Sequence, residues 1–168
     1  MIRFKEANIS HIPMIRNLAI LIWNEHYISI LSKAQIDYML DLIYNEEALK
    51  HQMTFGNQQF ILAYKNEQAV GFCAYEINAE NNKTKMHKLY VLLEFRKLNI
   101  GKYFLEYIFN VAIANNQQAI FLNVNKYNNS KYFYEKEGFS IIREEIIDIG
   151  NDYIMDDFVM EKEINQRN

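Results

Sequence analysis

The sequence predicts a mixed α/β fold: a single domain over residues 1–168, with a central mixed, twisted sheet of about seven strands and helices on both of its faces. The first observation is a change of period, because apolar residues recur at helical spacing early in the chain and in short strand-like runs afterwards. The second is the later alternation of strand and helix patterns, which is typical of sheets covered by helices. The third is size: 168 residues, 50% of them hydrophobic, can bury a core without disulfide or metal support.

The first third of the chain has the pattern of one strand followed by two helices. Residues 2–7 alternate in polarity, as a half-buried strand does. Ser10 suits the N-cap of a first helix, and Pro13 is tolerated there because it falls in the first turn. A second helix is predicted over residues 33–53. The apolar residues at helical spacing are Ile12, Ile15, Leu18, Ala19 and Ile22 in the first helix, and Ile36, Met39, Leu40, Ile43 and Tyr44 in the second.

The rest of the chain predicts six further strands and two helices. Residues 65–68 split two apolar runs and indicate a hairpin, and residues 78–83 form a polar turn before the next strand. Gly138 ends the last helix. The predicted strands are 59–64, 69–77, 84–91, 119–124, 139–147 and 153–161, and the predicted helices are 99–115 and 128–136.

Composition excludes several classes of protein. The one cysteine, Cys73, rules out an internal disulfide framework and suits a reducing compartment. The N-terminal residues lack a signal-peptide pattern, and no run approaches the ~20 apolar residues that cross a bilayer. A net charge of −3 without a dense basic stripe argues against nucleic acid as the main partner. We expect a cytoplasmic protein with no membrane partner.

The most informative stretch is a strand-like run at residues 85–91, a short basic loop at 92–102 and an amphipathic helical run that begins at Tyr103. Such a junction directs backbone N–H groups and the positive end of the helix dipole at one place. Phosphate binds there with little help from side chains, so the stretch predicts a site for a phosphorylated cofactor. The alternative is an ordinary strand-to-helix turn with a solvated basic loop.

The loop residues fit a phosphate site although glycine is scarce. Asn99 is the type of non-glycine residue most at ease with positive φ, and Gly101 leaves room for close approach of backbone and phosphate. Arg96, Lys97 and Lys102 add positive charge for the outer phosphates. The loop matches neither the Rossmann glycine fingerprint nor the Gly-Lys-Ser/Thr ending of a nucleoside-triphosphate loop.

A second cluster follows a later strand, where Asn128 precedes a short helix with the sequence Phe133-Tyr134-Glu135-Lys136-Glu137-Gly138-Phe139. Together with Leu89-Tyr90-Val91 and Arg96-x-x-Asn99-x-Gly101, this resembles the GCN5-related N-acetyltransferase (GNAT) superfamily. Its members move an acetyl group from acetyl-CoA to an amine. The resemblance covers nearly the whole chain in element order, and residues 86–139 in specific positions.

The resemblance implies acetyl-CoA as the cofactor, with no metal. The strand ending at Val91 would pair with the pantetheine arm as an added strand would, and the following loop would hold the pyrophosphate. Asn99 replaces the first loop glycine of the family and Leu93 a common proline; Asn99 could weaken cofactor affinity. The implied cofactor-binding residues are Leu89, Tyr90, Val91, Arg96, Lys97, Leu98, Asn99, Ile100, Gly101, Lys102 and Asn128.

The resemblance also places Tyr134 beside the thioester sulfur, where a phenol can protonate the leaving thiolate during direct attack by the amine. The strand backbone near Tyr90 would stabilise the oxyanion. No acetyl-enzyme is required, and Cys73 in an apolar strand is expected to be an inert core thiol.

The general base stays open at this point. His87 lies on the strand that leads into the cofactor loop, and histidine titrates near neutrality. Glu76 on the preceding strand, Glu25 and His26 after the first helix, and a chain of waters are the alternatives.

Acceptor selection is expected from the segment between the first two helices and from the late strands. Trp23, Tyr27 and Tyr38 are candidates to wall a pocket. A looser resemblance of these regions to bacterial polyamine acetyltransferases suggests a small amine or polyamine. The candidate acids for its cationic group are Glu25, Asp37, Asp156 and Asp157, and a solvated acidic face is the alternative.

Three functions therefore compete: acetylation of a small-molecule amine, acetylation of a protein N-terminus or lysine, and CoA sensing without catalysis. A protein acceptor would need an open groove. The roles that the resemblance implies for Asn128 and Tyr134 favour an enzyme. We expect it to be a monomer or a homodimer.

Overall fold

The computed structural model describes residues 1–165, and its strands are β1 (Ile2–Glu6), β2 (Gln59–Lys65), β3 (Gln68–Glu80), β4 (Lys83–Val91), β5 (Ala119–Asn125), β6 (Ser140–Gly150) and β7 (Tyr153–Glu163). They form one seven-stranded sheet in the order β1-β2-β3-β4-β5-β7-β6. Strands β4 and β5 pair in parallel, whereas β1–β2, β2–β3, β5–β7 and β6–β7 are antiparallel. The predicted mixed sheet is confirmed.

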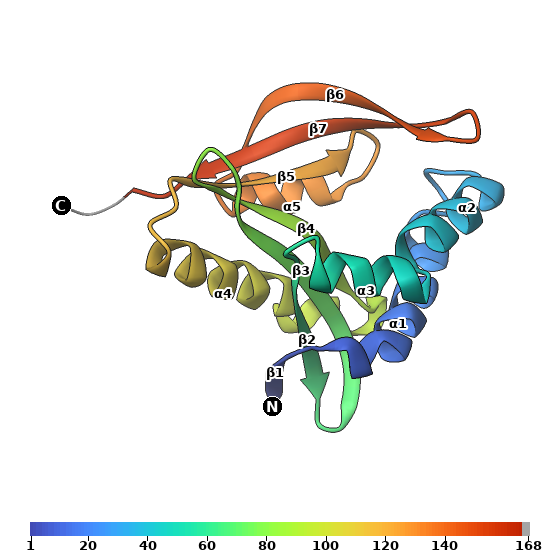
Figure 1. The fold of residues 1–168 in the computed structure, drawn as a ribbon, viewed down its shortest axis with the longest axis horizontal. Coiled ribbons are helices and arrows are strands. Elements are labelled where there is room, and N and C mark those ends of the chain that lie inside the picture. Colours follow the sequence, from blue (N-terminus) through green and yellow to red (C-terminus); the bar gives the residue numbers. More distant parts are fainter. Residues whose placement is uncertain (166–168) are drawn as a thin grey trace. The chain divides into compact units, whose positions relative to one another are not determined.

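The helices, drawn as coiled ribbons in Figure 1, follow β1, β4 and β5 in the chain. They are η1 (Ile9–His11), α1 (Ile12–His26), α2 (Lys33–Tyr44), α3 (Glu46–Thr54), η2 (Leu93–Leu98), α4 (Ile100–Ala114) and α5 (Ser130–Lys136). The short 3₁₀ segments η1 and η2 were not predicted, since patterns this short leave no apolar period.

The prediction of a single helix over residues 33–53 is wrong, because the chain forms two helices there, α2 and α3. Asn45, between them, is extended, with φ −66° and ψ 159°. Its side-chain oxygen accepts a hydrogen bond from the Ala48 N–H at 2.8 Å and so caps α3. An asparagine side chain at an N-cap accepts from a backbone N–H at the start of a helix, and this capping of α3 explains the break between α2 and α3.

The start of the first helix also differs from the prediction. Asn8 rather than Ser10 is a cap here: it caps η1, since its side chain accepts from the Ser10 N–H at 2.9 Å, and the N-cap position of α1 is His11. The α-helix proper then begins at Ile12, with Pro13 in its first turn as expected.

The chain divides into two compact units. Unit 1 comprises residues 1–76 and 87–107, and unit 2 comprises residues 77–86 and the chain from residue 108 onward. Strands β3 and β4 and helix α4 therefore each contribute to both units.

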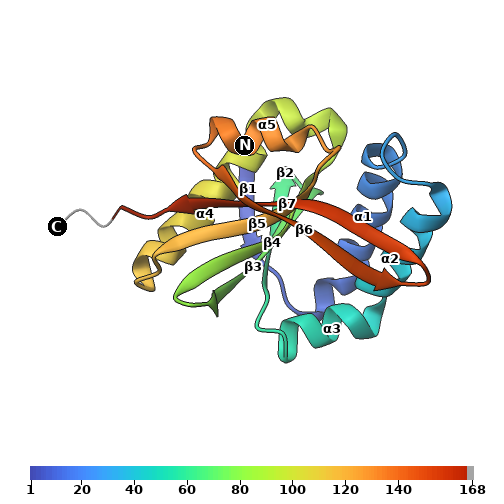
Figure 2. The same cartoon turned by 90° about the horizontal axis from the view of Figure 1, so that it is seen from above.

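Unit 1 has helices on both faces of its strands. Phe72 and Tyr75 are three residues apart on β3 and project from opposite faces. The Phe72 ring packs on Tyr44 of α2 at 6.1 Å, and the Tyr75 ring packs on Tyr107 of α4 at 6.2 Å between centroids. Figure 2 shows α1, α2 and α3 gathered together within this unit. The prediction of helices on both faces is confirmed here.

In unit 2, β7 lies between β5 and the edge strand β6 (Figure 1). Helix α5 packs through Tyr134, whose ring lies 5.9 Å from that of Phe139. Gly138 has φ +94°, a value that L side chains rarely adopt, so the predicted glycine end of this helix is confirmed.

Within residues 1–165, no helix is both long and apolar enough to span a membrane.

Candidate functional site

The end of β4 and the start of α4 in unit 1 form a tight turn. The Leu92 N–H donates to the Val70 carbonyl at 2.9 Å, which keeps the chain on β3 up to the end of β4. After η2, Asn99 adopts the left-handed conformation, with φ 58° and ψ 22°. The positive φ predicted for Asn99 is confirmed, and it lets α4 begin at once.

This turn presents backbone donors to an anion. The Tyr103 N–H donates to the Asn99 carbonyl at 3.1 Å, so α-helical bonding begins there. The preceding N–H groups, of Ile100, Gly101 and Lys102, belong to the first helical turn, in which backbone donors have no intrahelical acceptor. They lie at the positive end of the α4 dipole, a site suited to phosphate. Lys102 and Lys97 are both exposed.

The exposed Arg96 side chain braces this turn. Its Nε donates to the Val91 carbonyl at 3.2 Å, and one terminal nitrogen lies 3.4 Å from Nδ1 of His26. A guanidinium carries five N–H donors, so this brace is compatible with a phosphate contact. Arg96 thereby links the end of β4 to the end of α1.

Two candidates for the general base, the Glu76 carboxylate and the His87 imidazole, lie next to each other. Nε2 of His87 on β4 is 2.8 Å from Oε2 of Glu76 on β3, and both side chains are half-buried. With Glu76 ionised, the neutral ring keeps its proton on Nε2 and its basic lone pair on Nδ1. Glu76 therefore orients His87 and would stabilise the imidazolium after proton uptake.

The candidate acceptor residues of α1 lie in an aromatic cluster, not on an open wall. Trp23 and Tyr27 are 3% and 6% exposed, and their rings are 4.5 Å apart. Trp23 also packs on Tyr90 of β4 at 6.0 Å and on Tyr44 at 5.9 Å. Burial raises the pKa of the Tyr44 phenol, which therefore remains protonated. This cluster connects α1 and α2 to the strand segment Leu89–Val91.

A buried lysine beside this cluster was missed by sequence reasoning. Lys88 is 6% exposed, and its Nζ donates to Oε1 of Gln58 at 2.8 Å. The ammonium also lies over the rings of Phe60 at 5.3 Å and Tyr44 at 5.9 Å. The available signal was the strand alternation of Thr84, Met86 and Lys88, whose shared face is buried.

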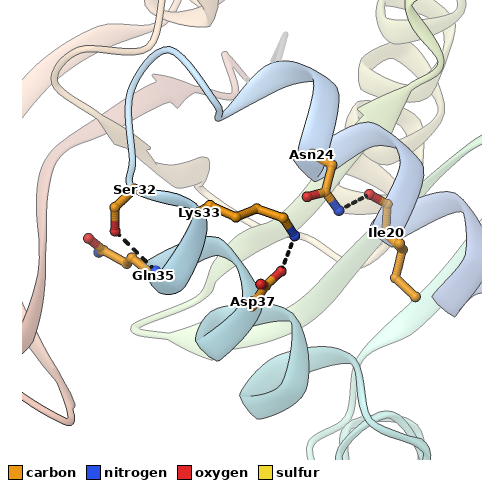
Figure 3. A network of polar contacts seen from close by, with 6 residues as sticks. All are labelled: Ile20, Asn24, Ser32, Lys33, Gln35 and Asp37. Carbon is orange, nitrogen blue, oxygen red and sulfur yellow. Dashed lines mark hydrogen bonds and ion pairs between the residues drawn. The ribbon is translucent and has the colours of Figure 1, made fainter.

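The candidate acids near α1 and α2 are exposed. Figure 3 shows Lys33 and Asp37 forming an ion pair along α2, beside the bond from Asn24 to the Ile20 carbonyl. Glu25 is likewise exposed, and Tyr38 is half-buried. A cationic substrate at Asp37 would have to displace the Lys33 ammonium.

In unit 2, a polar turn joins β5 to α5. The Asn125 carbonyl accepts from the Asn128 N–H, and Oδ1 of Asn128 accepts from the Ser130 N–H, both at 2.9 Å. Asn128 therefore organises the entry to α5. Tyr134 follows on α5, 7% exposed, with its ring 5.2 Å from that of Phe133.

The candidate acids of β7 project to opposite faces. Asp156 pairs with Lys126 at 2.9 Å, and Lys126 also reaches Glu144 at 2.9 Å. The hydrogen bonds that the Lys126 ammonium donates to Glu144 and Asp156 raise its pKa. Asp157 is 5% exposed and accepts from Nδ2 of Asn123 at 3.3 Å.

The Cys73 thiol lies on β3. Cys73 is fully buried, and burial raises the pKa of its thiol, so it is an inert core residue as expected. Among the residues that the structure describes, no three His, Cys, Asp or Glu side chains are arranged to hold a metal ion.

Comparison with known proteins agrees with this fold. The family model described as "Acetyltransferase (GNAT) domain" matches residues 29–157, and the chain belongs to that family. It is thus an acetyl-CoA-dependent acetyltransferase, as the sequence resemblance implied.

Solved structures share the fold over almost the whole chain. PaiA N-acetyltransferase from Thermoplasma acidophilum, in complex with coenzyme A, is 24% identical with a TM-score of 0.81, covering 98% of this chain and 99% of that one. A GNAT-family acetyltransferase from Staphylococcus aureus Mu50 is 24% identical with a TM-score of 0.72, covering 97% and 99%. The ribosomal-protein-S18-alanine N-acetyltransferase from Escherichia coli is 12% identical with a TM-score of 0.74, covering 100% and 97%.

Proposed function

We propose that this acetyltransferase acetylates the primary amine of a small molecule, such as a polyamine, with His87 as the general base. The observation that carries the proposal is the 2.8 Å contact between His87 and Glu76, on the strand that ends in the anion-binding turn. Only the neutral amine attacks a thioester, so a nearby group must accept the proton. An imidazole oriented by a carboxylate is suited to that task.

The proposed cofactor site uses the turn between β4 and α4. The N–H groups of Ile100, Gly101 and Lys102 would bind the pyrophosphate, with Lys97 and Lys102 contributing charge. Leu89 to Val91 would pair with the pantetheine arm through the strand backbone, and Leu98 and Asn99 would shape the turn. In unit 2, Asn128 would contribute its side chain to cofactor binding.

The chemistry then divides among few groups. Acetyl-CoA supplies an activated acetyl group as a thioester. His87 would take the proton of the attacking amine, and the backbone near Tyr90 would stabilise the charge that develops on the carbonyl oxygen. Tyr134 would protonate the departing thiolate, because a phenol gives up a proton without carrying charge beforehand.

A small acceptor is favoured by the packing of α1. Trp23 is buried against Tyr90, and Tyr27 is buried against Trp23, so the end of α1 is a packed aromatic cluster, which suits a small acceptor better than a polypeptide. Coenzyme A occurs with the PaiA N-acetyltransferase relative, which supports the cofactor but leaves the acceptor to experiment.

The test of the base is a double-mutant cycle on His87 and Glu76. His87→Gln should lower kcat by about 10²- to 10⁴-fold, the range for a removed general base. Glu76→Gln should lower kcat by a smaller factor. In the His87→Gln background it should leave kcat almost unchanged, because Glu76 acts through His87. Glu80→Gln, an exposed change on the same strand, is the matched control. Unchanged turnover in His87→Gln would transfer the role to Glu25, His26 or water.

A further inference from the structure

One side-chain amide in unit 2 draws two carboxylates together. Nδ2 of Asn123 lies 2.7 Å from Oε2 of Glu145 and 3.3 Å from Oδ2 of Asp157. Glu145 and Asp157 are register partners on β6 and β7, and Asn125, two residues after Asn123, is the β5 partner of Asp157. Because side chains alternate along a strand, Asn123, Glu145 and Asp157 share one face of this sheet.

Asp157 lacks a full set of partners in this arrangement. It is 5% exposed, and within the described part of the chain its buried Oδ1 has no hydrogen-bond partner. Burial raises the pKa of Asp157, as do the nearby charges of Glu145 and Asp156, whereas the Asn123 hydrogen bond and Lys85 oppose the shift. A buried carboxylate oxygen without a donor is costly, so the site gains from a bound donor.

The chemistry of the site favours an ammonium group over a metal ion. The carboxylates of Glu145 and Asp157 offer oxygen acceptors beside the Asn123 amide, and an ammonium has three N–H donors. The described residues include no cluster of three or more metal-binding side chains. By contrast, Asp156 on the other face of β7 already has Lys126 at 2.9 Å.

The site is close to the residues of unit 2 that are proposed to act on the acetyl group. Asn125 pairs with Asp157, and its carbonyl accepts from the Asn128 N–H at 2.9 Å. Two residues of strand, about 7 Å, separate Asn123 from Asn125. A short aliphatic chain could therefore connect a cation at Asp157 to an amine at the β5–α5 turn.

We propose that Glu145 and Asp157, held together by the Asn123 amide, bind the second ammonium of a diamine or polyamine acceptor while its first amine is acetylated. This inference rests on the proposed function, and it selects Asp157 from the four candidate acids. It adds Asn123 and Glu145, which the sequence did not single out, as specificity-determining residues.

The kinetic test compares 1,4-diaminobutane with butylamine, which differ by one terminal ammonium. Asp157→Asn and Glu145→Gln should raise KM for the diamine by about ten- to hundredfold and leave KM for butylamine nearly unchanged, because only the diamine loses a charge-assisted bond. Glu144→Gln removes the same charge from the next residue of β6, on the other face, and should leave both KM values as in the wild type. An unchanged ratio of KM values in Asp157→Asn would overturn the proposal.

Calorimetry with 1,4-diaminobutane and no acetyl-CoA separates this proposal from the proposed function. The wild type should bind the diamine, and Asp157→Asn should bind it at least tenfold more weakly. If the wild type binds the diamine in this way but releases no CoA, the proposed acetylation fails while the cation site stands. Equal affinity in the two proteins, or no binding to the wild type, would overturn the cation site.

Thermal unfolding gives a readout that does not depend on catalysis. Because the folded-state pKa of Asp157 is raised, ionising this carboxyl reduces stability as pH rises from the ordinary carboxyl pKa through the raised value. Asp157→Asn should therefore melt at a higher temperature than the wild type at pH 7, and the gap should close in acid. A lower melting temperature of Asp157→Asn at pH 7, with unchanged diamine affinity, would make Asp157 a structural residue and refute the proposal.

Discussion

Replacing Gly71 by alanine should damage acetyl transfer through the backbone of β4. A Cβ at residue 71 would lie 2.6 Å from the Tyr90 carbonyl oxygen and 3.2 Å from the Val91 Cα. Real Cβ contacts essentially never fall below 3.0 Å, so the backbone of β4 must move away from β3. The Leu92–Val70 hydrogen bond of 2.9 Å resists that movement directly beside the substituted residue.

The expected loss follows from the size of this displacement. The Tyr90 oxygen must move from 2.6 Å to at least 3.0 Å from the new Cβ. A misplacement of ~1 Å at reacting groups can cost ~100-fold, so this smaller shift should lower kcat/KM for acetyl-CoA by about five- to tenfold. Overpacking should also lower the free energy of unfolding by about 1–3 kcal/mol.

The assay is CoA release by the folded protein, together with urea unfolding. Gly56→Ala is the matched control, because its Cβ would lie 2.9 Å from the Gln52 carbonyl oxygen, in the turn that follows α3. That variant should lose comparable stability and keep wild-type kcat/KM. If both variants lose activity only in proportion to their stability, the proposed role of the Tyr90–Val91 backbone is refuted.

Three further predictions concern single groups. Tyr134→Phe should keep acetyl-CoA affinity near the wild-type value in calorimetry while kcat falls by about 10²- to 10⁴-fold; equal turnover would remove Tyr134 from the mechanism. Gly101→Val should block approach of the backbone to the pyrophosphate and abolish measurable acetyl-CoA binding, and unchanged affinity would disprove the loop assignment. Cys73 should resist a thiol reagent in the folded protein, because it is 0% exposed and burial raises its pKa; labelling at the rate of a free thiol would contradict its placement.

The fold could be predicted where local sequence decides the conformation. Strand β4, the loop and helix α4 follow one another without a gap, and Asn99 is one of several asparagines with positive φ, such as Asn81, Asn82 and Asn151. The break at Asn45 was missed because the apolar period of residues 33–53 continues through it. The cap formed by the Asn45 side chain decided the conformation there, although the helical spacing of the apolar residues predicted one continuous helix.

The candidate site was harder to predict from the sequence, because its contacts join residues that are far apart in the chain. Glu76 and His87 appear in the sequence as competing bases, and only strand pairing makes them partners at 2.8 Å. The contacts of Asn123 with Glu145 and Asp157 span 22 and 34 residues and depend on the register of β5, β6 and β7. Alternation predicts which side chains share a face of one strand, but it does not predict the register between strands.

The most direct measurement of acetyl transfer to a small amine is the rate of CoA release from acetyl-CoA by the wild-type protein over a panel of acceptors. The panel should contain 1,4-diaminobutane, butylamine, free amino acids and peptides, with the product identified by mass. The account predicts fast CoA release and an N-acetylated product with the diamine, and little with peptides. Acetylation of peptides alone, or no amine-dependent release of CoA with any member, would contradict it.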